Sequence, residues 1–156
     1  MLDISIPGLG ERELKYLVLD YNGTIALDGD LITGVQELII KLSKIFEIYV
    51  LTSDTYGTVR EKCKNLPVKI STYPCDNAMD RKYDEVIKLG SKNVVAIGNG
   101  RNDCRMCKEA ILSIGIMENE GVSGLLIQNV DIVCKSIMEA LELLLNEKRI
   151  IATLRG

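Results

Sequence analysis

Asp20 begins a short polar stretch that could do chemistry. It follows an apolar run that ends at Leu19, and the sequence then continues through Asn22 and Gly23 to Thr24. A carboxylate, a tight turn of free N–H groups and a hydroxyl are the components of a phosphate site that uses an acid as its nucleophile. For this stretch alone, an Asp that only caps a turn is an equally good interpretation.

Polar residues also follow two other apolar runs. Thr52 and Ser53 end one of them, Gly98–Asp103 follows another, and Lys82 lies between the two in the sequence. If these runs are parallel strands, their carboxyl ends meet on one edge of the sheet, where ligands bind in open α/β sheets. Two carboxylates, a hydroxyl and an ammonium group on one edge suit a phosphoryl group together with Mg²⁺. The hydroxyl and Lys82 would hold phosphate oxygens, and the acids would hold the metal.

The composition excludes several other kinds of site. The chain has no histidine, so Ser-His-Asp triads, Cys-His dyads and His-ligated zinc are ruled out. Its five cysteines are an odd number and predict reduced thiols. A net charge of −3 gives no electrostatic footprint for nucleic acid or anionic lipid, so neither is expected as a partner.

The sequence also carries an expectation about location. No apolar run is long enough to span a bilayer, so no membrane association is expected. The first residues lack the basic region of a signal peptide, and we therefore expect a cytoplasmic protein.

Strands and helices must alternate to position these residues. The apolar fraction of 47% is mainly aliphatic, as buried parallel strands prefer. We predict an N-terminal β-hairpin that leads into the first central strand, with its turn at Pro7–Gly10. The further expected strands cover 16–19, 46–51, 67–71, 93–97, 111–116 and 131–134. The expected helices cover 56–64, 77–89, 122–128 and 136–146. Two more are expected, one capped by Thr33 and one that runs through Lys108. Residues 148–156 are expected to form a partly apolar tail. This alternation predicts an α/β fold with a doubly wound, three-layer parallel sheet in a single domain, 1–156.

In order and at the expected strand ends, these clusters resemble the four motifs of the haloacid dehalogenase (HAD) superfamily over nearly the whole chain. Asp20–Thr24 resembles the first motif, whose aspartate is the nucleophile. Thr52 resembles the second motif and Lys82 the third. Gly98–Asp103 resembles the acidic fourth motif, with Asp103 as a metal ligand. The resemblance implies a HAD/Rossmann-like fold, Mg²⁺ as cofactor and an aspartyl-phosphate intermediate.

Within the superfamily, the chain looks most like the phosphorylation domain of P-type ATPases and the small soluble P-type ATPase-like proteins. Asp20–Thr24 and Thr52–Asp54 fit that style. The segment between Thr24 and Thr52 is too short for a nucleotide-binding domain, and no cap domain is expected. An open site accepts large substrates or is covered by another subunit, and we therefore lean towards a homo-oligomer. The expected partner is a small phosphorylated substrate or a phosphorylated macromolecule.

Two residues depart from the pattern of the family. Asn22 stands where many HAD phosphatases carry an Asp that is first general acid and then general base. An amide cannot shuttle a proton, and loss of a positioned acid or base typically costs roughly 10²–10⁴ in rate. Asn99 stands where the fourth motif usually has its first Asp, which removes one negative charge near the metal. A weaker affinity for Mg²⁺ is therefore expected. The metal ligands that the resemblance implies are Asp20, Asn22 through its backbone carbonyl, Asn99 and Asp103.

Two functions remain open. One is a slow, Mg²⁺-dependent phosphohydrolase acting through a phosphoenzyme, and the other is a phosphate- or nucleotide-binding regulatory module with little turnover. In the first function the resemblance gives catalytic roles to Asp20, Asn22, Thr52 and Lys82. It gives substrate-binding roles to Gly23, Thr24, Ser53 and Asn102.

Three further features have two interpretations each. Asp54 contacts substrate or Lys82, or caps the helix that follows it. Arg101 binds phosphate or is solvated. Cys104 and Cys107 are spaced like a redox or metal pair, but the chain has no second pair, which favours a structural role.

Overall fold

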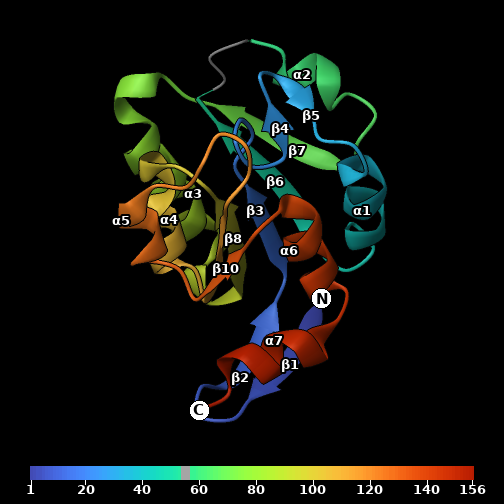
Figure 1. Cartoon of the computed structure of the whole chain (residues 1–156), viewed down its shortest axis with the longest axis vertical. Coiled ribbons are helices and arrows are strands. Elements are labelled where there is room, and N and C mark those ends of the chain that lie inside the picture. Colours follow the sequence, from blue (N-terminus) through green and yellow to red (C-terminus); the bar gives the residue numbers. More distant parts are fainter. Residues whose placement is uncertain (54–56) are drawn as a thin grey trace.

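The computed structural model describes residues 1–53 and 57–156, and its centre is a six-stranded parallel sheet (Figure 1). The strand order is β10-β9-β8-β3-β6-β7, and every neighbouring pair is parallel. The strands are β3 (Tyr16–Leu19), β6 (Glu47–Thr52), β7 (Val68–Thr72), β8 (Val94–Gly98), β9 (Leu112–Ile116) and β10 (Ile132–Cys134). The doubly wound parallel sheet predicted from the sequence is confirmed.

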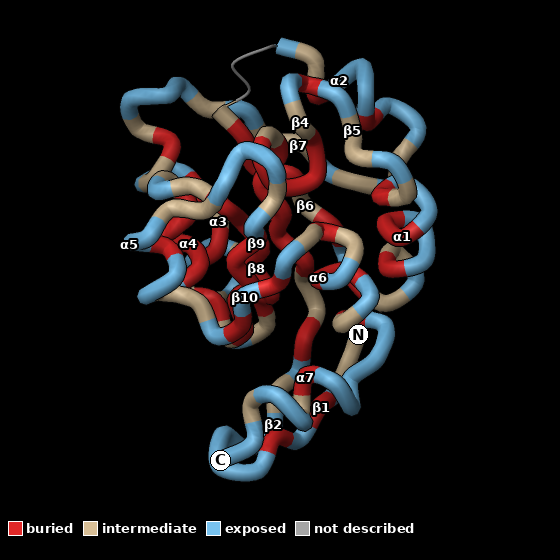
Figure 2. Tube along the Cα trace, in the orientation of Figure 1, coloured by how far each residue is buried: buried red, intermediate tan, exposed pale blue. Residues whose placement is uncertain are grey.

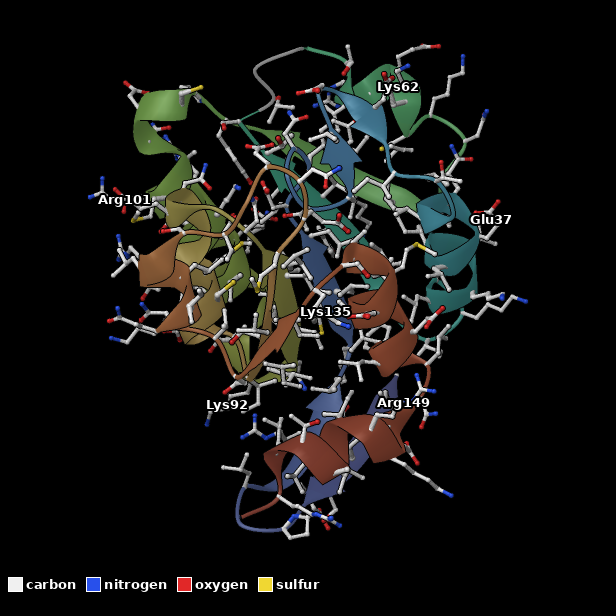
Figure 3. All side chains as sticks on the ribbon, viewed as in Figure 1. Glu37, Lys62, Lys92, Arg101, Lys135 and Arg149 are labelled. Atoms are coloured by element: carbon white, nitrogen blue, oxygen red, sulfur yellow. The ribbon has the colours of Figure 1, made fainter. Side chains whose placement is uncertain are left out.

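Helices cover both faces of the sheet, because its strands are apolar on both sides. Leu17 and Leu19 of β3 belong to one core cluster, and Val18 belongs to the other. The first cluster includes α1 (Val35–Leu42) and α6 (Ile137–Leu144), and the second includes α3 (Ala78–Leu89), α4 (Cys104–Glu109) and α5 (Gly124–Ile127). Figure 2 shows the central strands buried and the outer sides of the helices exposed. In Figure 3 the exposed side chains of Glu37, Lys62 and Arg101 lie at the edge of the molecule.

The N-terminal hairpin extends from one end of the sheet (Figure 1). It pairs β1 (Leu2–Ile6) with β2 (Gly10–Leu14), and it leads through Lys15 into β3, as predicted. Residues 148–156, expected as a tail, instead lie mostly in a helix, α7 (Glu147–Leu154), which packs against β1 and buries Ile150. The chain then ends against the hairpin turn, where the N–H of Gly156 donates to the carbonyl of Pro7.

Several short elements differ from the prediction. Residues 25–31, expected as a loop, contain a small hairpin of β4 (Ala26–Leu27) and β5 (Asp30–Leu31). The N-cap of α1 is Gly34 rather than Thr33, and no side chain caps this helix. The helix predicted at 56–64 is shorter, α2 (Val59–Lys62), and the cap proposed for Asp54 lies outside the described residues. The described part of the chain also contains three 3₁₀ turns: η1 (Cys75–Asn77), η2 (Ser91–Asn93) and η3 (Arg101–Asp103).

The path of the chain creates a crevice beside β3. The strands after β3 are added on one side as β6 and β7, and the chain then crosses back through α3 to place β8 on the other side. Ligands in open α/β sheets bind at such a reversal, outside the carboxyl ends of the strands. Within the described residues, only β4, β5 and α1 separate β3 from β6, so no cap domain is inserted there. None of the helices in the described part of the chain has the length and hydropathy needed to cross a membrane.

Candidate active site

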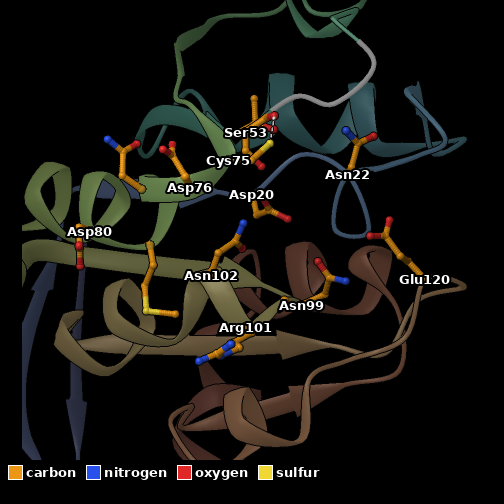
Figure 4. Close-up of a pocket in the computed structure, with 14 residues that line it drawn as sticks. Asp20, Asn22, Ser53, Cys75, Asp76, Asp80, Asn99, Arg101, Asn102 and Glu120 are labelled. Atoms are coloured by element: carbon orange, nitrogen blue, oxygen red, sulfur yellow. Dashed lines mark hydrogen bonds between the residues drawn. The ribbon is translucent and has the colours of Figure 1, made fainter.

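Asp20 lies at the carboxyl end of β3, next to the end of β8. Its N–H donates to the carbonyl of Ile97 at 3.0 Å, and only 6% of the residue is exposed. A pocket of about 620 Å³ opens at this edge (Figure 4). The predicted site residues that line it are Asp20, Asn22, Thr52, Ser53, Asn99 and Asn102. The sheet edge therefore brings together most of the residues singled out from the sequence.

Lys82 connects two carboxylates beneath this pocket. It lies on α3, is completely buried, and places Nζ 2.6 Å from Oδ1 of Asp20 and 2.7 Å from Oδ1 of Asp103. A third contact, at 3.4 Å, joins Nζ to the side-chain oxygen of Asn102. Because a buried ammonium group requires charged partners, these contacts fix the position of Lys82 and orient Asp20.

The burial of this cluster changes its proton affinities. Burial raises the pKa of Asp20 to about 6, the nearby charge of Asp103 adds to the shift, and the ammonium of Lys82 limits it. Burial lowers the pKa of Lys82, but the charges of Asp103 and Asp20 outweigh it, so the net shift is upward. Lys82 thus stays protonated at neutral pH, and Asp20 is mostly a carboxylate, the form needed in a nucleophile.

Asp103 is bound on both of its carboxylate oxygens. Oδ1 contacts Lys82, and Oδ2 accepts hydrogen bonds from the N–H groups of Asn99 at 3.1 Å and Gly100 at 3.0 Å. The residue is fully buried and is not among the residues that line the pocket within the described chain. These contacts show Asp103 holding Lys82 and the turn after β8.

Asn99, in contrast, lines the pocket. Its Nδ2 donates to the carbonyl of Gly121 at 2.9 Å, and its Oδ1 lies 3.3 Å from the hydroxyl of Thr24. That hydroxyl is 3.1 Å from Oδ2 of Asp20, so it donates mainly to the carboxylate. Gly23 has a φ of +81°, and a Cβ there would lie 2.4 Å from Nδ2 of Asn99. The turn after Asp20 therefore packs directly on Asn99.

The side chain of Asn22 forms a hydrogen bond with the small hairpin of β4 and β5. Its Oδ1 accepts a hydrogen bond from the N–H of Gly29 at 3.0 Å. The carbonyl of Gly29 accepts from the hydroxyls of Tyr21 at 2.8 Å and Thr58 at 3.1 Å. The Asn22 amide thus stabilises the hairpin beside the pocket, and it has no acidic proton to give. Among the described residues, the backbone carbonyl of Asn22 accepts no hydrogen bond.

The pocket also has walls that the sequence did not predict. Cys75, Asp76 and Asp80 come from η1 and the start of α3, and Glu120 comes from the loop after β9. Cys75 donates through Sγ to the carbonyl of Ser53 at 3.7 Å. Cys75, Asp76 and Glu120 lie in turns and loops without periodic patterning, and Asp80 is a polar residue in the first turn of a helix, so the sequence carried no signal for their place at the pocket.

The structure also places the other residues that had two interpretations, Arg101 and the cysteines Cys104 and Cys107. Arg101 is exposed and lines the pocket (Figure 4). Cys104 and Cys107 are free thiols buried against the sheet, and burial raises the pKa of both. High thiol pKa values oppose metal binding and redox exchange, so the pair acts as part of the core.

The donor set at the pocket fits a magnesium ion of the kind used in phosphoryl transfer. The described residues contain no group of three or more His, Cys, Asp or Glu side chains that could hold a metal. Mg²⁺ at such sites usually takes one or two carboxylates and completes its shell with water and substrate phosphate. The carboxylate of Asp20, the free carbonyl of Asn22 and the amide oxygen of Asn99 are oxygen donors of the required type.

No family model matches the sequence. Two proteins of the archaeon Methanocaldococcus jannaschii are related to it. "Uncharacterized protein MJ0073" is 48% identical over 65 residues, which are 42% of this chain and 70% of that protein. "Uncharacterized protein MJ0072" is 49% identical over 39 residues, which are 25% of this chain and 89% of that protein. The chain belongs to the family of these archaeal proteins.

Solved structures show which fold this chain has. The 3-deoxy-D-manno-octulosonate 8-phosphate phosphatase from Moraxella catarrhalis, in complex with magnesium, phosphate and the sugar, superposes with a TM-score of 0.65 at 20% identity. The match covers 91% of this chain and 94% of that one. A haloacid dehalogenase-like hydrolase from Streptococcus pneumoniae superposes with a TM-score of 0.56 at 18% identity, over 74% and 60% of the two chains. This chain has the HAD fold.

A second phosphatase extends the comparison. The cobalt-bound enzyme for the same sugar phosphate from Haemophilus influenzae has a TM-score of 0.68 and 13% identity, and it covers 92% of this chain and 94% of its own. In the HAD fold of the present chain, Asp20 follows the central strand β3 and faces the pocket. The fold predicted from the four motifs is therefore confirmed.

Proposed function

We propose that this protein is a Mg²⁺-dependent phosphohydrolase that cleaves a phosphate ester or anhydride through an aspartyl phosphate on Asp20. The observation that carries the proposal is the Asp20 carboxylate itself. It faces the pocket, with one oxygen 2.6 Å from Lys82 and the other 3.1 Å from the hydroxyl of Thr24. The phosphatases with this fold, one of them holding magnesium and phosphate, support the assignment of phosphoryl chemistry.

In the first step, a carboxylate oxygen of Asp20 attacks phosphorus and the bond to the leaving oxygen breaks. The product is an acyl phosphate on Asp20, and the leaving group departs with the electron pair of the broken bond. Thr52 and Ser53 line the pocket beside Asp20 and supply hydroxyl groups for the phosphate oxygens. A magnesium ion, when bound, neutralises charge between the carboxylate and the phosphate.

In the second step, water attacks the acyl phosphate, inorganic phosphate leaves and the Asp20 carboxylate is restored. This step needs a base to take a proton from the water, and the first step needs an acid for a poor leaving group. Asn22 can serve as neither, because its side chain is an amide that accepts the N–H of Gly29. We therefore infer that the phosphoenzyme forms readily from good leaving groups and is discharged slowly.

The proposed metal set is Asp20, the carbonyl of Asn22 and the amide oxygen of Asn99. Asp103, predicted from the resemblance as a ligand, has both oxygens bound to Lys82 and to backbone N–H groups. In this proposal it positions Lys82, and the loss of a carboxylate at Asn99 weakens the binding of the cation.

A second candidate function follows from the same two amides. A protein that binds phosphate or a nucleotide with Mg²⁺ and turns it over negligibly would act as a regulatory module. The bound side chain of Asn22 and the uncharged side chain of Asn99 favour it. Mg²⁺-dependent binding of phosphate without any release from an ester would support this function.

We further propose that residues 1–156 act as one domain, in the cytoplasm, on a small phosphorylated substrate or a phosphorylated macromolecule. The pocket is open, so a second copy of the chain could cover it. Size-exclusion chromatography with light scattering measures the oligomeric state directly.

The experiment that tests the proposed function compares wild-type protein with Asp20→Ala on para-nitrophenyl phosphate with Mg²⁺. This substrate has a good leaving group, so it does not need an acid at Asn22. Activity that is lost in the variant supports the proposal, and equal rates in the two proteins contradict it. A screen of sugar phosphates, nucleotides and phosphoproteins then identifies the substrate class.

A further inference from the structure

The proposed cation site is short of negative charge. Asp20 is its one carboxylate among the proposed ligands, because Asn99 carries an amide and Asp103 is bound on both oxygens by Lys82 and the turn after β8. The charge of the ligands strongly influences the affinity of a site for a divalent cation. A further carboxylate at this pocket would supply the negative charge that is absent at Asn99.

Glu120 is placed to supply that carboxylate. It lies in the loop between β9 and α5 and lines the same pocket as Asp20, Asn22 and Asn99. In Figure 4 its carboxylate points from this loop towards the space between Asn22 and Asn99. The carboxylate of Glu120 is therefore directed towards two of the proposed cation ligands, Asn22 and Asn99.

Hydrogen bonds tie the loop of Glu120 to Asn99. The carbonyl of Gly121 accepts from Nδ2 of Asn99 at 2.9 Å, and the N–H of Ser123 donates to the backbone carbonyl of Asn99 at 2.8 Å. On the other side, Glu118 accepts the N–H of Ile137 at 2.7 Å and so joins the loop to the start of α6. The backbone around Glu120 is thus held in place beside the pocket from both directions.

The side chain of Glu120 has no structural task in the described part of the chain. It is exposed, and it makes no hydrogen bond or ion pair with any described residue. Glu118, two residues earlier, is in contrast occupied by its bond to Ile137. A carboxylate that is unpaired and aimed into a polar pocket is available for a cation.

We propose that Glu120 is a ligand of the divalent cation and replaces the carboxylate that Asn99 lacks. The site would then take two carboxylates, from Asp20 and Glu120, and oxygens from Asn22 and Asn99. The inference rests on the proposed Mg²⁺ site, but it does not depend on turnover. Binding of the cation would also join the loop after β9 to the end of β3.

The test measures Mn²⁺ binding to the full chain by calorimetry, without any phosphorylated compound. We expect Glu120→Gln to weaken binding by roughly tenfold or more, since even residues behind the ligands cost about 10- to 100-fold when removed. The matched control is Asp76→Asn, which removes a charge from the same pocket but on the opposite side of Asp20 (Figure 4). This control should change the affinity by no more than about twofold, because Asp76 is exposed and salt screens its charge.

The possible outcomes separate the two proposals. If wild-type protein binds Mn²⁺ and Glu120→Gln binds it equally well, the role of Glu120 is refuted while the Mg²⁺-dependent function stands. An equal loss in Asp76→Asn also refutes it, because the effect would then be that of pocket charge alone. If wild-type protein does not bind Mn²⁺, the inference about Glu120 is refuted, and the proposed function is judged separately by the comparison of wild-type protein with Asp20→Ala, because Mg²⁺ at such sites also takes oxygens from substrate phosphate.

Measuring Glu120→Gln in the Asn99→Asp variant gives an independent check of the role of Glu120. Asn99→Asp restores the strand-end carboxylate, so Glu120→Gln should weaken Mn²⁺ binding less in that variant than in wild-type protein. Equal losses in the two backgrounds would mean that Glu120 and Asn99 do not serve the same ion. Thermal unfolding without metal should be unchanged in Glu120→Gln, because its side chain has no partner among the described residues.

Discussion

The ammonium group of Lys82 lies 2.6 Å from the carboxylate of Asp20; Lys82 is fully buried, and 8% of the Asp20 side chain is exposed, at the pocket. A second contact at 2.7 Å joins Lys82 to Asp103 on the side away from the pocket. The proposed nucleophile is therefore held by a cation that is itself fixed by a second acid. This arrangement links the stability of the fold to the chemistry of the site.

Replacing Lys82 with Met should destabilise the protein by about 3–5 kcal/mol, because two buried carboxylates would lose their partner. Urea unfolding measures this change. The control is Lys88→Met on the same helix, whose exposed pair with Glu85 spans 3.5 Å. This exposed pair should contribute less than about 1 kcal/mol. Similar losses in the two variants would contradict the structural role given to Lys82.

Gly23→Ala should destabilise the turn that follows Asp20 for two reasons. Its φ is +81°, and the new Cβ would lie 2.4 Å from the side chain of Asn99. Gly10→Ala separates these causes, because Gly10 has a similar φ of +80° and nothing within 4 Å of a Cβ. Strain of this backbone alone costs about 1–3 kcal/mol, and thermal unfolding should show a larger loss at Gly23. A smaller loss at Gly23 would contradict the close packing on Asn99.

Asn22→Asp should increase the rate of phosphoenzyme hydrolysis, by up to roughly 10²–10⁴-fold, because it supplies a general base. The fold should tolerate the change, since a carboxylate oxygen can still accept the N–H of Gly29. The rate should also become less dependent on the pKa of the leaving group, and a series of aryl and alkyl phosphates measures this. Asn102→Asp places an acid in the same pocket and should give no acceleration. Unchanged hydrolysis in Asn22→Asp would show that another group already acts as the base.

Cys75 should be the first thiol to react with iodoacetamide in the folded protein. It is exposed at the pocket, whereas Cys63, Cys104, Cys107 and Cys134 are buried. Burial raises the pKa of Cys134 to about 11, so few of its thiols are ionised near neutral pH. Peptide mass spectrometry identifies the modified residue, and Mg²⁺ with phosphate should slow its modification. Equal early labelling of a buried cysteine would contradict the described packing.

Much of the fold could be predicted because its signals are local. Each central strand is an apolar run that ends at a polar residue, and parallel strands bring such ends to one edge. Asp20 and Thr52 therefore met at the pocket as the sequence indicated, with Lys82 beneath it. The helix α7 was missed because its pattern is short and partly polar, and its stability comes from packing on the hairpin.

The details of the site depend on tertiary contacts that no periodic pattern encodes. Asn99 precedes the 3₁₀ turn η3 and Asp103 is its last residue, and only the folded turn shows that Asn99 lines the pocket while Asp103 binds Lys82. Glu120 lies in a loop with no pattern, and the hydrogen bond that Asn99 donates to the carbonyl of Gly121 holds this loop at the pocket. The bond between Asn22 and Gly29 arises from a hairpin that the sequence suggested only as a loop.

The most direct test of the central claim is detection of the phosphoryl group on Asp20. Wild-type protein is mixed with acetyl phosphate and Mg²⁺, quenched in acid, and analysed by intact-protein and peptide mass spectrometry. The account predicts one phosphoryl group on Asp20 that hydroxylamine removes, less of it in Asn22→Asp, and none in Asp20→Asn. Phosphate release without any adduct on wild-type protein, or an equal adduct on Asp20→Asn, would contradict it.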